Sequence, residues 1–201
     1  MAPAVRPLRV IACGAIAPEL RQAYAALGVD VVIEPLPAPL HNTPERITAA
    51  VLDRIAAHPH DRILVGYADC GTGGRLDSAL AERGIERLPG AHCYEFFAGP
   101  DAFARIADAE PGTFYLTDFL LRNFDLLIWR GLGLDRHPEL RDTYFGNYRR
   151  LVYLSQREDP KAVAAGEAAA QRLGLEYEHI HTGLGPLASA LSVVPTPSGA
   201  T

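Results

Sequence analysis

Short apolar runs rich in β-branched residues alternate along the chain with segments whose apolar residues recur at helical spacing. The pattern begins with an expected strand over 8–13, a helix over 18–27 and a strand over 29–33, and it ends with a helix over 160–173 and a strand over 175–180. Such alternation with short connections is typical of a parallel sheet covered by helices. We therefore predict an α/β fold, a single three-layer domain over residues 1–194 with a mostly parallel sheet flanked by helices. Residues 195–201 are expected to form a flexible C-terminal tail.

The composition is that of an ordinary globular protein, with 48% hydrophobic and 21% charged residues in a chain of 201. The net charge of −5 argues against a nucleic-acid-binding surface, which needs a basic patch. No apolar run approaches the roughly 20 residues that span a bilayer, so no membrane partner is expected. The first seven residues are too short and too polar for a secretion signal, which predicts a cytoplasmic protein with reduced thiols.

The three cysteines, Cys13, Cys70 and Cys93, each fall where a predicted strand ends and a turn begins. In a parallel sheet these ends meet at one edge, which is where open α/β sheets bind ligands. Three thiols at that edge can hold a zinc ion or an iron–sulfur cluster with one position left free. Any one cysteine is explained as well by burial as a small hydrophobic residue. Because no cysteine falls elsewhere in the chain, we favour a shared metal site.

Two histidines are candidates for a fourth metal ligand. His41 lies in a proline-rich segment after the second predicted strand, which we expect to be an extended loop at the same edge. His92 precedes Cys93, and along a strand its side chain would point to the opposite face. We therefore expect His92 to lie beside the metal ligands or in the core, and we take His41 as the ligand.

The turn that starts at Cys70 is rich in glycine and reads Cys-Gly-Thr-Gly-Gly-Arg. If a helix follows the turn, its dipole lowers the pKa of the Cys70 thiol. The backbone N–H groups of such a turn can also cradle an anion. Arg75 can hold a substrate carboxylate or balance the charge of the thiolates. These features predict a cofactor-binding turn of Gly71, Thr72, Gly73 and Arg75.

Two carboxylates stand next to the cysteines in the sequence, Asp69 directly before Cys70 and Glu95 two residues after Cys93. We assign both to acid–base catalysis, since a carboxylate can move a proton or orient a ligand at such a site. Capping of a helix is the alternative for each of them.

A very apolar segment over 118–129 predicts one long helix, with apolar residues on one broad face. Such a helix can sit in the core or in the interface of a homodimer.

Four blocks of the sequence and the segment over 129–140 resemble a bacterial and archaeal family of domains of unknown function. The blocks are Ile-Ala-Cys-Gly-Ala over 11–15, Leu-His-Asn-Thr-Pro-Glu-Arg-Ile over 40–47, Tyr-Ala-Asp-Cys-Gly-Thr-Gly-Gly over 67–74 and Pro-Gly-Ala-His-Cys-Tyr-Glu-Phe-Phe over 89–97. The resemblance implies genes encoded near corrinoid-dependent methyltransferases and one-carbon enzymes, and hence methyl or sulfur chemistry on small molecules. It implies no particular reaction.

Three functions follow from these patterns. The leading one is a metal- or iron–sulfur-dependent enzyme, a lyase or transferase, that acts on a small anionic molecule in sulfur or one-carbon metabolism. The second is a non-catalytic metal- or cofactor-binding accessory protein for a methyltransferase, in which His41 closes the coordination shell. The third is a metal-free enzyme with Cys70 as nucleophile and His41 or His92 as base. They predict, in turn, a metal with an exchangeable ligand, a metal without one, and a single reactive thiol without metal.

Overall fold

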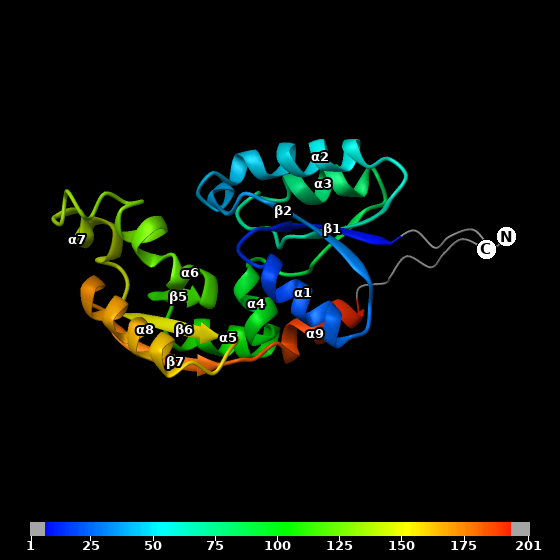
Figure 1. Cartoon of the computed structure of the whole chain (residues 1–201). Coiled ribbons are helices and arrows are strands. Elements are labelled where there is room, and N and C mark those ends of the chain that lie inside the picture. Colours follow the sequence, from blue (N-terminus) through cyan, green and yellow to red (C-terminus); the bar gives the residue numbers. More distant parts are fainter. Residues whose placement is uncertain (1–6, 194–201) are drawn as a thin grey trace. The chain divides into compact units, whose positions relative to one another are not determined.

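The computed structural model describes residues 7–193, which form two compact units (Figure 1). Unit 1 comprises residues 7–96 and 184–193, and unit 2 comprises residues 97–183. Each unit has its own parallel sheet flanked by helices, which confirms the α/β class. The strands are divided between two sheets, however, where the sequence predicted one.

The described range excludes residues 1–6 and 194–201, so the predicted tail over 195–201 lies outside it, as do the side chains of His41 and Val193. Within the described range, no helix combines the length and the apolar content that crossing a bilayer requires.

The sheet of unit 1 has four parallel strands in the order β2-β1-β3-β4. The strands are β1 (Leu8–Cys13), β2 (Val31–Leu36), β3 (Arg62–Gly66) and β4 (Glu86–Arg87). Val10, Ile11 and Ala12 of the central strand β1 are fully buried, as expected for a strand covered on both faces. The register pairs Cys13 at the end of β1 with Leu36 at the end of β2.

Helices cover both faces of this sheet, with α1 and α9 on one side and α2 and α3 on the other (Figure 1). Their bounds are α1 (Ala17–Ala26), α2 (Ile47–Ala57), α3 (Arg75–Ala81) and α9 (Gly185–Val193), and α4 (Cys93–Ala98) follows the last strand. Ile47, Val51 and Ile55 form the buried face of α2, as their spacing predicts. The sequence pattern did not predict α9, whose buried apolar side chains, Leu187 and Leu191, lie one helical turn apart.

The proline-rich segment after β2 is not the extended loop that was predicted. β2 continues through Pro35, and two 3₁₀ turns follow, Ala38–Asn42 and Pro44–Arg46. Prolines are compatible with the start of such turns because their fixed φ suits it and the missing N–H has no acceptor there.

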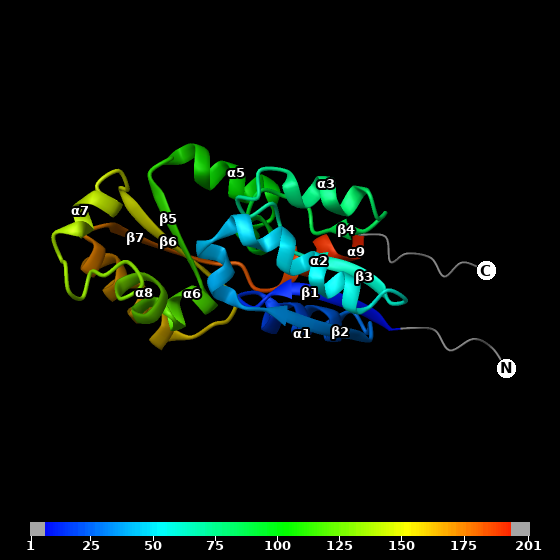
Figure 2. The same cartoon turned by 90° about the horizontal axis from the view of Figure 1, so that it is seen from above.

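The sheet of unit 2 has three parallel strands in the order β5-β6-β7: β5 (Thr113–Thr117), β6 (Arg150–Ser155) and β7 (Glu176–His181). Helix α5 (Pro100–Ala109) lies on one face and α8 (Pro160–Leu173) on the other (Figure 2). The core on the α8 side joins Leu116, Leu151 and Tyr153 of the sheet to Ala170 and Leu173 of α8.

Two helices of unit 2 are shorter than predicted. The segment over 118–129 is divided into α6 (Asp118–Arg122) and a π-helical turn, Asp125–Trp129, because the Asn123 side chain donates to the Phe119 carbonyl where the helix would continue. The long apolar helix suggested for a dimer interface is therefore two short pieces. Of the helix expected over 138–150, the structure retains α7 (Leu140–Phe145), since Arg150 already belongs to β6.

Candidate functional site

Unit 1 brings the three cysteines together. Cys13 and Cys70 are buried, and Cys93 is half-buried. Burial raises the pKa of Cys70 to about 11, and the charge of Cys13 contributes to the rise. Burial also raises the pKa of Cys93, with further contributions from the charges of Cys70 and Cys13. The three sulfur atoms thus lie within one electrostatic neighbourhood, although they come from three separate segments of the chain.

The backbone brings the three cysteines together in a different way from the one predicted. Only Cys13 ends a strand, because β3 stops at Gly66 and Cys93 is the first residue of α4. Beyond the sheet, the backbone N–H groups of Asp69 and Cys70 donate to the carbonyls of Gly90 (3.2 Å) and Ala91 (2.9 Å). This pairing of two loops, and not a shared strand edge, places Cys70 beside Cys93.

Cys70 has a strained backbone. Its φ of 48° makes it the only residue other than glycine with a positive φ in the described part of the chain. Side chains with a Cβ avoid this region at a cost of about 1–2 kcal/mol. Residues held in such conformations cluster at functional sites, where the surrounding structure over-determines them.

The carboxylate of Asp69 stabilises the turn that begins at Cys70. Its carboxylate accepts hydrogen bonds from the Thr72 hydroxyl (2.6 Å) and from the N–H groups of Gly73 (3.2 Å) and Gly74 (2.9 Å). These hydrogen bonds, that of Thr72 first, lower the pKa of Asp69 to about 2. A carboxylate of such low basicity is a poor general base near neutral pH. Asp69 therefore stabilises the turn before α3 through Thr72, Gly73 and Gly74, and it is not a side-chain cap of that helix.

Glu95 has the same kind of role in the facing loop. Its Oε1 atom accepts a hydrogen bond from the Ala91 N–H at 2.9 Å. Its carboxyl group also lies so close to Gly90 that a Cβ at that position would come within 2.7 Å of Oε2. Glu95, which lies within α4, thus holds the loop that leads into Cys93.

Tyr67 is a residue of the site that sequence reasoning missed. It is only 2% exposed, and its buried hydroxyl has no hydrogen-bond partner of ordinary geometry. Burial raises the pKa of Tyr67, and the Cys13 and Cys70 thiols raise it further, so the hydroxyl faces the cysteines. A thiol is only a weak hydrogen-bond acceptor, so the Tyr67 hydroxyl is left with a weak interaction with Cys13. Its place three residues before Cys70 was the only signal in the sequence.

The segment that carries His41 is anchored against two of the cysteine loops. The Leu36 carbonyl accepts the Gly14 N–H at 2.8 Å, next to Cys13. At the other end, Pro44 lies 3.3 Å from the position of a Cβ on Gly71, next to Cys70. The backbone of the 3₁₀ turn with His41 therefore runs between these two contacts. His92, by contrast, is exposed, and because Cys93 starts a helix, the strand geometry expected for His92 is wrong.

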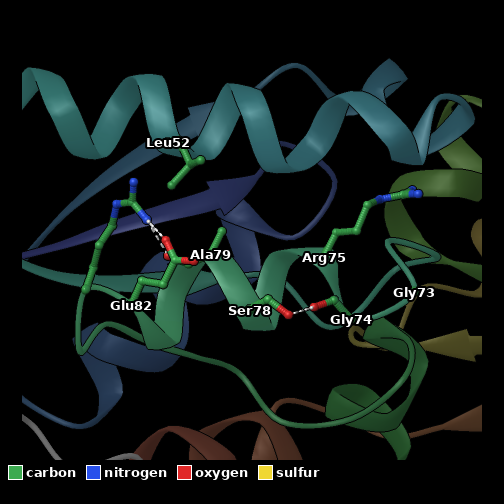
Figure 3. Close-up of a pocket in the computed structure, with 8 residues that line it drawn as sticks. Leu52, Gly73, Gly74, Arg75, Ser78, Ala79 and Glu82 are labelled. Atoms are coloured by element: carbon green, nitrogen blue, oxygen red, sulfur yellow. Dashed lines mark hydrogen bonds and ion pairs between the residues drawn. The ribbon is translucent and has the colours of Figure 1, made fainter.

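Part of the predicted cofactor-binding turn faces a pocket between α2 and α3 (Figure 3). The pocket measures about 450 Å³, and Gly73, Gly74 and Arg75 line it together with Leu52 of α2. Arg75 is exposed, and its side chain extends away from Glu82 (Figure 3). Gly71 and Thr72 do not line this pocket. Of the predicted cofactor-binding residues, Gly73 and Arg75 thus line this pocket.

The side chains as they stand do not form a completed metal shell. Within the described residues, no group of three or more His, Cys, Asp or Glu side chains is arranged to hold a metal ion. The thiols are also less acidic than predicted, since the pKa of Cys70 lies near 11 instead of below its usual range. The helix dipole cannot lower it because α3 begins only at Arg75 and has seven residues.

Comparison with known proteins places the chain in one family, and the matched segment includes Cys70 and Cys93 but not Cys13. Residues 35–191 match the model of the family described as "Protein of unknown function (DUF1638)". Neither the curated proteins nor the solved structures contain a match.

Proposed function

Because the chain belongs to the DUF1638 family, whose description assigns no activity, we propose a function from the site in unit 1 itself. The protein is a metal-dependent enzyme in which Cys13, Cys70 and Cys93 hold a zinc ion or an iron–sulfur cluster. It acts on a small anionic molecule in sulfur or one-carbon metabolism in the cytoplasm. The observation that carries this proposal is the convergence of three buried or half-buried thiols with the buried hydroxyl of Tyr67, which interacts with Cys13.

The donor set suits a thiophilic metal. Thiolates select zinc and iron–sulfur clusters over the oxygen-binding cations. In the metal-free protein, repulsion between thiolate charges opposes ionisation of the cysteines. A bound cation would relieve this repulsion. Rotation of the cysteine side chains about Cα–Cβ, between staggered positions, is the movement that binding would require.

Each neighbouring residue then has a defined task. Asp69 and Glu95 hold the two loops that carry Cys70 and Cys93. The Tyr67 hydroxyl donates a hydrogen bond to the Cys13 thiolate or to the bound substrate. Arg75 binds the anionic group of the substrate. A metal held with one position free would act as a Lewis acid toward a sulfur or oxygen atom of the substrate.

The metal-free alternative, with Cys70 as nucleophile, is disfavoured by the raised pKa of this thiol, since the thiolate is the reactive form. An accessory protein for a methyltransferase is the second candidate. The backbone of the turn that contains His41 lies between the Cys13 and Cys70 loops, so His41 can supply the ligand that closes the coordination shell. The family that the sequence resembles is often encoded near corrinoid-dependent methyltransferases. In either case, we therefore propose such a methyltransferase system as the partner.

Metal and sulfide analysis of protein purified without oxygen and without a nickel column tests the proposal. Cys13→Ser, Cys70→Ser and Cys93→Ser are analysed alongside, with Tyr24→Phe as a control in the core of unit 1. Iron with sulfide, or about one equivalent of zinc, should be present in wild type and control and lost in all three serine variants. Metal-free wild-type protein that also fails to take up zinc or iron would overturn the proposal.

Substitution with Co²⁺ separates the enzyme from the accessory protein. Co²⁺ reports its ligands by absorption, so an added small thiol should shift the spectrum if one position is open. If the thiol leaves the Co²⁺ spectrum unchanged, and if His41→Ala gives a Co²⁺ spectrum different from that of wild type, the closed shell of the accessory protein is favoured.

A further inference from the structure

Unit 2 contains a second pocket, at the carboxyl ends of β5 and β6, with charged side chains in a largely apolar wall. It measures about 230 Å³ and lies between the start of α6, the end of β6 and the first turns of α8. The polar side chains that line it include Asp118, Tyr153, Arg157 and Lys161. Ligands of parallel sheets bind at this edge, where the strands end and the helices begin. The pocket is formed by unit 2 alone and does not depend on the thiols of unit 1.

The floor of the pocket is a fixed hydrogen-bonded cluster. Asp118 is only 4% exposed, and its Oδ1 atom accepts from the Tyr153 hydroxyl (2.7 Å) and the Gln156 N–H (3.2 Å). Its Oδ2 atom accepts from Nε of Arg157 at 3.2 Å. The Gln156 amide oxygen in turn accepts the Asp118 N–H at 3.1 Å. Three donors therefore stabilise the Asp118 charge and orient Arg157 at the pocket wall.

The charges around the pocket do not balance. Three cationic side chains, Arg122, Arg157 and Lys161, line it with two carboxylates, Asp118 and Asp159. Asp159 accepts the Lys161 backbone N–H at 2.9 Å and so caps α8. The Lys161 ammonium has no ion pair among the described residues. Among the side chains that line the pocket, cations thus outnumber carboxylates by one, and the Lys161 ammonium is available to an anionic ligand.

Lys161 is also exceptional in the sequence, because every other basic residue of the chain is arginine. An ammonium is a compact point charge with three donors on a flexible stem, whereas a guanidinium binds as a flat fork. The ammonium can therefore turn toward an oxyanion inside a small pocket.

We propose that this pocket binds a small molecule through a single carboxylate group, held by Lys161 with Arg122 and Arg157. A monocarboxylate neutralises the surplus charge, whereas a phosphate dianion would leave a net negative charge beside Asp118. The volume corresponds to about seven or eight water molecules, which suits a compact ligand. Leu121, Ala162 and Ala165 line the rest of the pocket and contact its aliphatic part.

Titration of the full-length ¹⁵N-labelled protein, followed by two-dimensional NMR, tests this site. The probes are acetate, propionate and butyrate, with inorganic phosphate for comparison. Saturable shifts should centre on Asp118, Arg157 and Lys161, and a monocarboxylate should bind more tightly than phosphate. Lys161→Met should weaken the binding by about tenfold, as expected for the loss of a charge-assisted contact. Arg136→Met removes the same charge from an exposed position outside the pocket and should leave the binding unchanged.

A second variant tests the pocket by changing its volume and leaving its charge unchanged. Ala162→Leu fills the pocket from the half-buried side of α8 and should abolish binding, while the spectrum confirms the fold. Absence of saturable binding by all three carboxylates, tighter binding of phosphate, or equal binding by Lys161→Met and wild type would each overturn the proposal.

Discussion

Cys70 combines a buried thiol with a backbone that a side chain disfavours. The turn is held by three hydrogen bonds to Asp69, so the fold supports a conformation that glycine would adopt without strain. A cysteine at such a position is best explained by a need for its sulfur atom.

This strain can be measured by comparing two variants that both remove the thiol. Cys70→Gly should be more stable than Cys70→Ala by about 1 kcal/mol, because only glycine adopts a φ of 48° freely. Urea unfolding of the metal-free proteins gives the difference. Equal stability of the two variants would show that the backbone is not strained at this residue.

Tyr67→Phe should separate stability from metal binding. The free energy of unfolding of the metal-free protein should change by less than about 1 kcal/mol, because the hydroxyl loses only an interaction with a thiol, which is a weak acceptor. Its zinc affinity should fall by about tenfold if the hydroxyl supports a ligand of the metal. Tyr24→Phe, at another buried tyrosine of unit 1, should leave zinc affinity unchanged. A loss of stability well above about 1 kcal/mol in metal-free Tyr67→Phe would contradict this reasoning.

At the scale of elements, Arg87 joins helix α3 to the loop before Cys93. Its guanidinium binds both oxygen atoms of Asp77 in α3, at 2.5 and 2.8 Å, and also donates to the carbonyls of Leu88 (2.7 Å) and Gly90 (3.2 Å). The loop over 88–92, which pairs with the Cys70 turn, is therefore held by Arg87, which is anchored on α3, and by Glu95 of α4.

This link should depend on pH. The hydrogen bonds from Arg87 lower the pKa of Asp77, so the carboxylate stabilises the fold above its unfolded-state pKa near 4. That contribution is lost as the pH falls through the lowered folded-state pKa. Asp77→Asn should therefore be less stable than wild type at pH 7, by less than about 1 kcal/mol because Asp77 is half exposed. The difference in melting temperature should shrink toward zero as the pH is lowered below 4, and a constant difference would contradict this reasoning.

At the scale of the whole molecule, the two units differ in how the chain builds them. Unit 2 is one continuous stretch with its own sheet and core. Unit 1 needs a distant segment, because α9 contributes the buried Leu187 and Leu191 to it. The two ends of the described chain thus belong to the same unit.

We expect residues 99–183 to fold alone, since they contain the complete sheet and core of unit 2. Residues 7–98 without α9 should be markedly less stable than unit 1 in the full chain, because Leu187 and Leu191 leave cavities. Thermal unfolding followed by circular dichroism checks both fragments. A non-cooperative melt of 99–183 would show that unit 2 depends on the rest of the chain.

The sequence by itself determined the α/β class, most strands and helices, and the cysteine-containing turns as candidates for the site. These features depend on local periodicity, glycine and proline, which a linear pattern records. Only the tertiary structure decided that the strands form two sheets, that loop pairing brings Cys70 beside Cys93, and that Tyr67 faces the thiols. It also decided that Asp118 and Lys161 share one pocket. Such contacts join residues that are far apart in the chain or placed by the geometry of their turns, so no short pattern encodes them.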